Sequence, residues 1–357
     1  MLSISRLGQG LLRQPIRQVC FHAHVAGRSA MTTAAAASPR NADQELALID
    51  KWKSAAIGQK SVLWDRMDAR PLTLLDQTLR PYLPPTYPSL PRSPQVGDIA
   101  SGTAMPPVAH LVYFPSPTAE PDLAPDGYLA EEAPPEPYAQ RVWAGGLIEF
   151  NPLNPLRVDA ISSQTKSIVD ITIKDTAALQ HLVFVKLALE ISNSSGHCLT
   201  EYRNLAYMKP VDLGRKIVAH PRSPDFTHVI DPSEILLFRY SSLSWNSHRI
   251  HYDSPYACDV EGHPGLLIHG PLTCTLLLQL LHANMPPGLT LKSFDYRAVS
   301  PAYCQQHMTL NGRWMQQRHK KSSADDASVL CELWATNNEN GIAMKGVATL
   351  VPSPSTV

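Results

Sequence analysis

Hydrophobic and polar residues alternate in several short stretches of the chain, and this period of two predicts β-strands. In the first half, strands are expected over residues 143–150, 168–174, 182–191 and 202–208. A shorter strand is expected over residues 111–114. In the second half, strands are expected over residues 235–240, 291–299, 308–314, 329–336 and 342–351. Strands that follow one another this closely favour antiparallel pairing.

Two stretches have helical periodicity instead. Residues 43–80 place apolar side chains at helical spacing, and residues 272–282 (LTCTLLLQLLH) are apolar on nearly every side. A helix that is apolar all round is buried in a core, and Pro286-Pro287-Gly288 ends the second one. The chain is therefore expected to be α+β, with a helix packed on an antiparallel sheet once or twice.

Prolines are concentrated in one part of the first half. Residues 71–137 hold 16 of the 32 prolines, and proline cannot donate a hydrogen bond to a helix or a strand ladder. A long irregular segment of this kind is usually a lid, a wrap or a linker. At about 150 residues per domain, we expect two domains, over residues 43–210 and 211–357, with the proline-rich insertion in the first.

Composition excludes several classes of protein. Hydrophobic residues make up 44% of the chain and charged residues only 17%, so the chain can bury a sizeable core and is not disordered as a whole. The 31 basic and 31 acidic residues cancel, which argues against a general nucleic-acid-binding protein. No apolar stretch approaches the roughly 18 residues of a membrane span.

The charge is unevenly distributed, because residues 1–42 contain basic but no acidic side chains. The basic ones are Arg6, Arg13, Arg17, Arg28 and Arg40. An Arg-rich, acid-free stretch followed by small hydroxylated residues is typical of a mitochondrial transit peptide; the alternative is a disordered basic tail. We expect a leader over residues 1–42 and a location in the mitochondrial matrix. Residues 43–357 then carry 26 basic against 31 acidic residues, so the mature protein is acidic.

The densest cluster of chemically active residues lies between residues 238 and 273. Asn246 and His251 are five residues apart on a polar, irregular stretch, where their side chains can converge on one point. Histidine can give and take a proton near neutral pH, and an asparagine amide can hold a hydroxyl without competing for the proton. Asp253 is a candidate for orienting the ring or bracing the loop.

His269 and Gly270 stand immediately before the apolar helix. A helix N-terminus presents unpaired N–H groups and positive partial charge, and glycine lets a ligand approach the backbone. These groups suit a thioester carbonyl that gains negative charge as an enolate. No metal site is expected, because no cysteine pair has CxxC spacing and the histidines of this region fit no metal-binding template. Those histidines are His248, His251, His263 and His269.

The stretch WNSHRIHYD (245–253), followed by the His-Gly pair, resembles the signature of the MaoC-like, hot-dog-fold enoyl-thioester hydratases and dehydratases. It is most similar to the subgroup of mitochondrial hydroxyacyl-thioester dehydratase type 2 proteins and mesaconyl-CoA-type hydratases. The stretches IGQKSVLWDRMDARPLTLLDQTL and RVWAGGLIEFNPLNPLRV also resemble that subgroup. The resemblance covers most of residues 45–351.

The resemblance implies an α+β double hot dog, in which two antiparallel sheets are each wrapped around a central helix. The second would be catalytic, and the first would be non-catalytic and help to form an acyl tunnel. His251 falls on the family's catalytic histidine, and Gly270 on the glycine whose N–H forms the oxyanion hole. Asn246 falls where most members have an acidic partner. Because an amide is not a general acid, proton transfer would rest on His251 alone, or partly on Asp253.

The activity implied is that of a (3R)-3-hydroxyacyl-thioester dehydratase of mitochondrial type II fatty acid synthesis. It would reversibly eliminate water, with syn geometry, to form a trans-2-enoyl thioester carried on acyl carrier protein or CoA. No metal or organic cofactor is implied by this activity. One alternative is a mesaconyl- or itaconyl-CoA-type hydratase of dicarboxyl thioesters. Others are an acyl thioesterase and a non-catalytic thioester-binding protein.

A basic cluster near the C-terminus offers a docking surface for the acidic carrier protein or the CoA phosphates. Its members are Arg313, Arg318, Lys320 and Lys321. The alternative is a solvated loop between strands. A duplicated hot dog forms a pseudo-dimer within one chain. The protein is therefore expected to be either a monomer of this kind or a homodimer.

Overall fold

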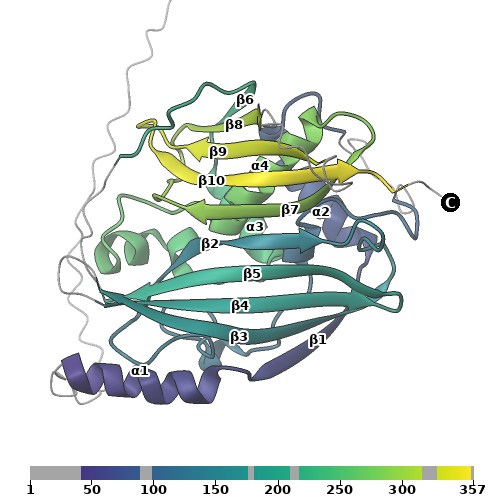
Figure 1. Cartoon of the computed structure of the whole chain (residues 1–357). Helices are drawn as coiled ribbons and strands as arrows, with labels where there is room; N and C mark the ends of the chain where they lie inside the picture. Colours follow the sequence, from purple (N-terminus) through teal and green to yellow (C-terminus); the bar gives the residue numbers. More distant parts are fainter. Residues whose placement is uncertain (1–41, 89–98, 176–180, 210–216, 316–327, 355–357) are drawn as a thin grey trace, which may run out of the picture.

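The computed structural model describes residues 42–88, 99–175, 181–209, 217–315 and 328–354. Within these residues, ten strands form one antiparallel sheet in the order β1-β3-β4-β5-β2-β7-β10-β9-β8-β6 (Figure 1). The strands of the first half are β1 (Lys60–Arg66), β2 (Gln140–Phe150), β3 (Ile161–Asp175), β4 (His181–Asn193) and β5 (Gly196–Met208). Those of the second half are β6 (Phe226–Ile230), β7 (Leu289–Ala298), β8 (Met308–Met315), β9 (Val329–Thr336) and β10 (Ile342–Pro352).

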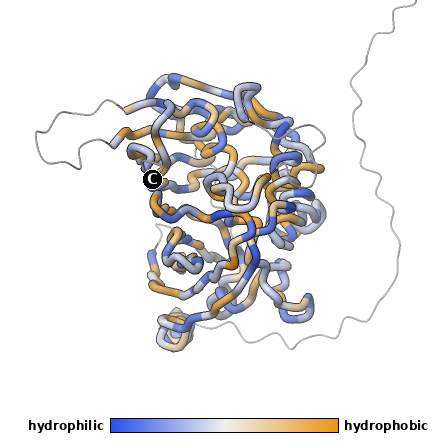
Figure 2. The backbone as a smooth tube through the Cα atoms, turned by 90° about the vertical axis from the view of Figure 1, so that its right-hand side faces the viewer, coloured by the Kyte–Doolittle hydropathy of each residue, from blue (hydrophilic) through white to orange (hydrophobic). Residues whose placement is uncertain are grey.

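The two halves of the sheet meet where β2 pairs with β7, and Ile148 lies opposite Phe294 in that register. Two sheets are expected from the sequence, and the structure joins them edge to edge into one. Figure 2 shows hydrophobic and hydrophilic residues interspersed along the described backbone. The domain boundary expected at residue 210 falls in the stretch 210–216, outside the described residues, and stays a prediction.

The second half of the sheet wraps around α4 (Gly270–Asn284), which contacts β6, β8, β9 and β10, and β2 of the first half. Its apolar residues are buried on all sides, as the sequence predicts; Leu272 and Leu276 are fully buried. Pro271 stands in the first turn, where a missing N–H costs nothing. The helix ends before Met285, since Pro286 disfavours helical backbone in the preceding residue.

The first half contains two helices, α1 (Ala42–Ala56) and α2 (Ala69–Leu79), and α2 contacts α3 (Glu234–Leu243) of the second half. Ile49 of α1 packs on the sheet in one apolar cluster with residues of β4 and β5. The helical pattern predicted over 43–80 is therefore two helices separated by β1. Strand β1 lies at the edge of the sheet, where few of its side chains are buried.

The described parts of the proline-rich insertion form a wrap. Its short helices are η1 (Arg80–Tyr82), η2 (Ala109–Val112) and η3 (Glu120–Asp122). Tyr113 and Phe114 are buried in the main core. The strand expected over 111–114 is therefore wrong, because its apolar residues pack at the end of a 3-10 helix and pair with no strand.

The strand expected over 235–240 is also wrong, because this stretch belongs to α3 (Glu234–Leu243). The Ser233 hydroxyl accepts a hydrogen bond from the backbone N–H of Leu236 and caps the helix. Leu236, Leu237 and Tyr240 are buried at helical spacing, whereas Ile235 is exposed. A short apolar run of this length does not distinguish a strand from a helix by periodicity alone.

Candidate active site

His251 lies at the end of the short helix η4 (Arg249–His251), on the loop that follows α3. Its side chain is buried, and its Nδ1 lies 2.9 Å from the backbone carbonyl oxygen of Leu267. Since a carbonyl only accepts, Nδ1 carries the proton and donates it, which leaves Nε2 with a free lone pair. The ring stacks on His269 with a centroid distance of 3.6 Å.

The protonation state of His251 follows from its burial. Burial, together with the neighbouring His248, lowers the pKa of His251 to about 3. Burial likewise holds the pKa of His269 well below its ordinary value. Both rings are therefore neutral near pH 7, and a neutral His251 is the form that can accept a proton.

Gly270 is the first residue of α4 and follows the N-cap residue His269. The stacked rings of His251 and His269 thus bring the base next to the helix N-terminus. The side chain of Trp143, from β2 of the first half, covers this point: a Cβ added to Gly270 would lie 2.9 Å from the Trp143 Cβ. The glycine is required by a close approach, and the first N–H groups of α4 have no intrahelical acceptor.

Asn246 lies on the same loop as His251 and stabilises it. Its side-chain oxygen accepts a hydrogen bond from the backbone N–H of His248 at 3.0 Å. The ring of His248 in turn contacts the ring of His251 edge to face. Since the side-chain oxygen of Asn246 already accepts this loop hydrogen bond, its amide NH2 is the group that can donate a hydrogen bond to a ligand.

Asp253 braces the loop. It accepts hydrogen bonds from the Arg249 guanidinium at 3.0 and 2.8 Å and from the backbone N–H of Tyr256 at 3.1 Å. These bonds lower the pKa of Asp253, the Arg249 bond most of all. Of the two roles that the sequence leaves open, the contacts favour bracing over orienting the His251 ring.

The proline-rich wrap touches this loop directly, which the sequence does not indicate. The backbone N–H of Arg249 donates to the Asp126 carbonyl at 2.8 Å. Asp126 is buried and ion-paired with Arg141 at 2.7 Å. Gly127 has a φ of +82°, and a Cβ there would lie 2.4 Å from the Ser247 carbonyl oxygen. Part of the first half therefore holds the histidine loop in place.

A second polar network lies buried in the first half. Glu201 receives hydrogen bonds from Arg203, at 3.0 Å to each carboxylate oxygen, and lies 3.1 Å from the Nε2 of His110. Burial alone would raise the pKa of Glu201, but Arg203 and His110 lower it to about 2. The Arg203 guanidinium also lies 4.5 Å from the centre of the Trp143 ring. No pattern in the sequence predicts this network, because its members are far apart along the chain.

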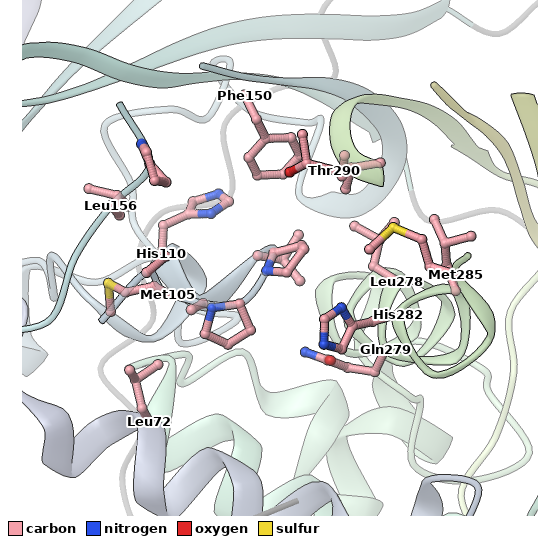
Figure 3. Close-up of a pocket in the computed structure, with 18 of the residues that line it drawn as sticks. Leu72, Met105, His110, Phe150, Leu156, Leu278, Gln279, His282, Met285 and Thr290 are labelled. Carbon is pink, nitrogen blue, oxygen red and sulfur yellow. The ribbon is translucent and has the colours of Figure 1, made fainter. Parts of the chain in front are cut away.

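A cavity of about 500 Å³ lies between α4, α2 and the proline-rich wrap (Figure 3). Its walls are mostly apolar, and the second half of α4 contributes Leu278, Gln279 and His282. His110 lines the cavity from the first half. Gly270 and Gln279 are nine residues apart, which is roughly 13 Å along a helix.

Some predicted features fall outside the described residues: the leader 1–42, except for Ala42, and Arg318, Lys320 and Lys321 of the basic cluster. Arg313 is described, lies on β8 and donates to the Ser223 carbonyl at 3.1 Å. In the described part of the chain, no helix is long and apolar enough to cross a bilayer. Nor do the described residues contain a group of three or more His, Cys, Asp or Glu side chains that could hold a metal ion.

The model of the family named hydroxyacyl-thioester dehydratase type 2 matches residues 108–304, more than half of the chain. The chain belongs to this family. Two mitochondrial hydroxyacyl-thioester dehydratase type 2 proteins are among its relatives. The Schizosaccharomyces pombe protein is 28% identical over 275 residues, which cover 70% of this chain and 89% of the relative. The Saccharomyces cerevisiae protein is 24% identical over 207 residues, 54% of this chain and 71% of the relative.

The mesaconyl-C(4)-CoA hydratase of Chloroflexus aurantiacus is a further relative of this protein. It is 33% identical over 217 residues, 59% of this chain and 75% of the relative. Both kinds of relative are hydro-lyases, so the prediction of a hydro-lyase is confirmed. The two yeast relatives confirm the mitochondrial location.

Solved structures confirm the fold. A MaoC-like dehydratase aligns with a TM-score of 0.58 at 14% identity, covering 84% of this chain and 99% of that one. A Mycobacterium tuberculosis protein with a double hot-dog fold aligns with a TM-score of 0.51 at 12% identity, covering 84% of this chain and 97% of that one. The predicted α+β double hot dog is therefore correct, with its two sheets joined through β2 and β7.

Proposed function

We propose that the protein dehydrates 3-hydroxyacyl thioesters in mitochondria and that His251 is its catalytic base. One observation carries the proposal. The buried, neutral ring of His251 is fixed through Nδ1 to the Leu267 carbonyl, and Nε2 is left free beside the N-terminus of α4. A neutral base next to unpaired N–H groups is what an elimination through an enolate requires.

The reaction begins with proton abstraction. His251 Nε2 takes a proton from C2 of the substrate, and the electron pair of that C–H bond moves toward the thioester carbonyl. The backbone N–H of Gly270 donates to the oxygen as it gains negative charge. The pair then forms the C2–C3 double bond, and the C3–O bond breaks. The leaving hydroxyl takes the proton from His251 and departs as water.

Asn246 orients the leaving hydroxyl through its amide NH2. An amide has no acidic proton to give near neutral pH, so His251 alone carries the proton in both directions. Removal and return of the proton by one group on one side of the substrate gives syn geometry. The (3R) configuration is the one that the family resemblance implies. Asp253 supports the loop through Arg249 and takes no part in proton transfer.

The cavity beside α4 holds the acyl chain. Its apolar walls suit a hydrocarbon, and it lies about 13 Å along the helix from Gly270. Burying each methylene is favourable by about 0.8 kcal/mol. A chain that reaches the cavity therefore binds more tightly than a four-carbon one.

Acyl carrier protein of type II fatty acid synthesis is the native carrier in this proposal, and CoA esters are its surrogates. Both are acidic, and residues 43–357 are acidic overall, so docking requires a local basic surface. Charge reversal at Arg318 and Lys320 is expected to raise the KM for carrier-bound substrate more than for CoA substrate. Equal KM values for wild type and variant would leave these residues as solvated surface.

A second candidate is hydration of a dicarboxyl-CoA, favoured by the identity to the mesaconyl-C(4)-CoA hydratase. A remote carboxylate needs a cationic partner when it is buried. No lysine or arginine is among the described residues that line the cavity. Rates for crotonyl-, decenoyl- and mesaconyl-CoA compared side by side decide between the two candidates.

The proposed role of His251 is tested by hydration of crotonyl-CoA. His251→Ala is expected to lose more than about a hundredfold in kcat. The control His263→Ala, in the segment between η5 (Tyr256–Val260) and α4, is expected to keep its activity. Circular dichroism shows that each variant is folded. Wild-type rates in a folded His251→Ala enzyme would contradict the proposal.

A further inference from the structure

The cavity beside α4 contains two buried polar side chains that the proposed dehydration does not use. His110 and Gln279 are each 2% exposed, and both line the cavity. The Nδ1 of His110 and the Oε1 of Gln279 have no hydrogen-bond partner among the described residues. Figure 3 shows them on opposite sides of the cavity, with the Gln279 amide directed toward its interior.

Such groups are unfavourable in an apolar cavity without a ligand. A buried polar atom with no partner costs about 1–3 kcal/mol, and a leucine at either position would avoid that cost. The His110 ring is also held firmly, because its Nε2 lies 3.1 Å from Glu201, which Arg203 binds in turn. A fixed ring with an unused nitrogen is a preorganised hydrogen-bonding group.

The chemistry of the two groups restricts what they bind. Since the Nε2 of His110 faces the carboxylate of Glu201, Nε2–H donates to that carboxylate, and Nδ1 is the ring atom left for a ligand. The Gln279 amide offers a donor as well as an acceptor. A hydroxyl both donates and accepts, so it can pair with Nδ1 of His110 and with the Gln279 amide at the same time.

A carboxylate fits less well. It only accepts, and it needs a compensating cation when buried. The described lining contains no lysine or arginine but does contain Asp76, and burial lowers the pKa of the lining residue His282. The cavity is therefore matched to a neutral hydrogen-bonding group.

We propose that His110 and Gln279 form a recognition site for a hydroxyl group on the acyl chain, remote from the thioester. The substrate class is then a 3-hydroxyacyl thioester that carries a second hydroxyl near the far end of a medium-length chain. This inference rests on the proposed function, because it places the reacting thioester at Gly270.

The test compares hydration of trans-2-enoyl-CoA esters with a methyl, a hydroxymethyl or a carboxyl terminus, in octenoyl, decenoyl and dodecenoyl lengths. For the full-length wild type, at one of these lengths, the hydroxylated ester is expected to have the highest kcat/KM of the three. In Gln279→Met the ratio of kcat/KM for hydroxylated to plain ester is expected to fall about tenfold. His110→Phe is expected to lower the same ratio.

The control is Leu276→Met, a volume-conserving change on the same helix but outside the cavity lining. It is expected to keep the wild-type ratio. Equal ratios in wild type, Gln279→Met and His110→Phe would overturn the recognition site, as would a preference for the carboxylated ester. If the recognition site fails this test, the proposed function still stands when the wild type hydrates the plain esters and His251→Ala does not. Absence of turnover for every ester would overturn both.

Discussion

The indole ring of Trp143 covers Gly270, so a residue of the first half closes over the helix N-terminus of the second. Trp143 is itself fixed on two sides. Its Nε1–H donates to the hydroxyl of Tyr296 at 3.1 Å, and Arg203 lies over its ring. The position of the Gly270 N–H therefore depends on packing between the halves.

Gly270→Ala is expected to lower kcat by about a hundredfold, the usual cost of losing one oxyanion donor. The added Cβ would lie 2.9 Å from Trp143, so the helix N-terminus must shift. The measurement is enoyl-CoA hydration with kcat and KM determined separately. Gly265→Ala is the matched control, because a Cβ there meets nothing within 4 Å. Equal losses in both variants would show that the contact with Trp143 does not matter.

Stability is expected to decrease as the pH falls below about 6.5. The pKa of His251 is about 3 in the folded protein, below the ordinary histidine value of about 6.5, so the unfolded chain binds the proton first. Stability from the neutral ring is fully present above about pH 6.5 and declines toward pH 3, by about 1.4 kcal/mol per pH unit. Urea unfolding at several pH values measures the slope. A His251→Gln variant should show a smaller slope, and an identical slope would contradict the assignment.

Glu201→Gln is expected to destabilise the protein by about 3 kcal/mol, because it removes the carboxylate that is ion-paired with the buried Arg203 guanidinium. The measurement is the free energy of unfolding in urea. Glu131→Gln serves as the control: Glu131 is half-exposed, and its partner Lys166 keeps Glu132. That change is expected to cost less than about 1 kcal/mol. Similar losses in the two variants would argue against a buried charge network.

Gly127→Ala is expected to reduce activity through the histidine loop. A Cβ at Gly127 would lie 2.4 Å from the Ser247 carbonyl oxygen, and the loop must move away. Gly58→Ala is a close control, because Gly58 has a similar φ of +85° but nothing within 4 Å of a Cβ. The two variants share the backbone strain, so a larger fall in kcat for Gly127→Ala isolates the clash. An equal fall in kcat for both variants would show that backbone strain alone causes the loss.

The strands and α4 are predictable from the sequence because their burial repeats with a period of two or covers every side. His251 and Gly270 are predictable because both belong to one continuous motif. Trp143 and Glu201 are not, since their partners are distant in sequence: Tyr296 is 153 residues from Trp143, and His110 is 91 residues from Glu201. Proline content signals the wrap but not its path, because irregular backbone has no period. The apolar run over 235–240 predicts a strand but forms part of α3. The hydrogen bond to the Ser233 hydroxyl caps that helix, and a short apolar run does not reveal it.

The pairing of β2 with β7 has a consequence for how the two halves can differ. In a symmetric dimer every substitution occurs in both copies, so neither copy can lose the catalytic base while the other keeps it. Here each half is encoded once and the partners never separate on dilution. One half can keep a single base while the other carries buried charges and polar cavity walls. Because both halves belong to one chain and share one sheet, the difference between them is fixed in a single sequence. It does not depend on protein concentration.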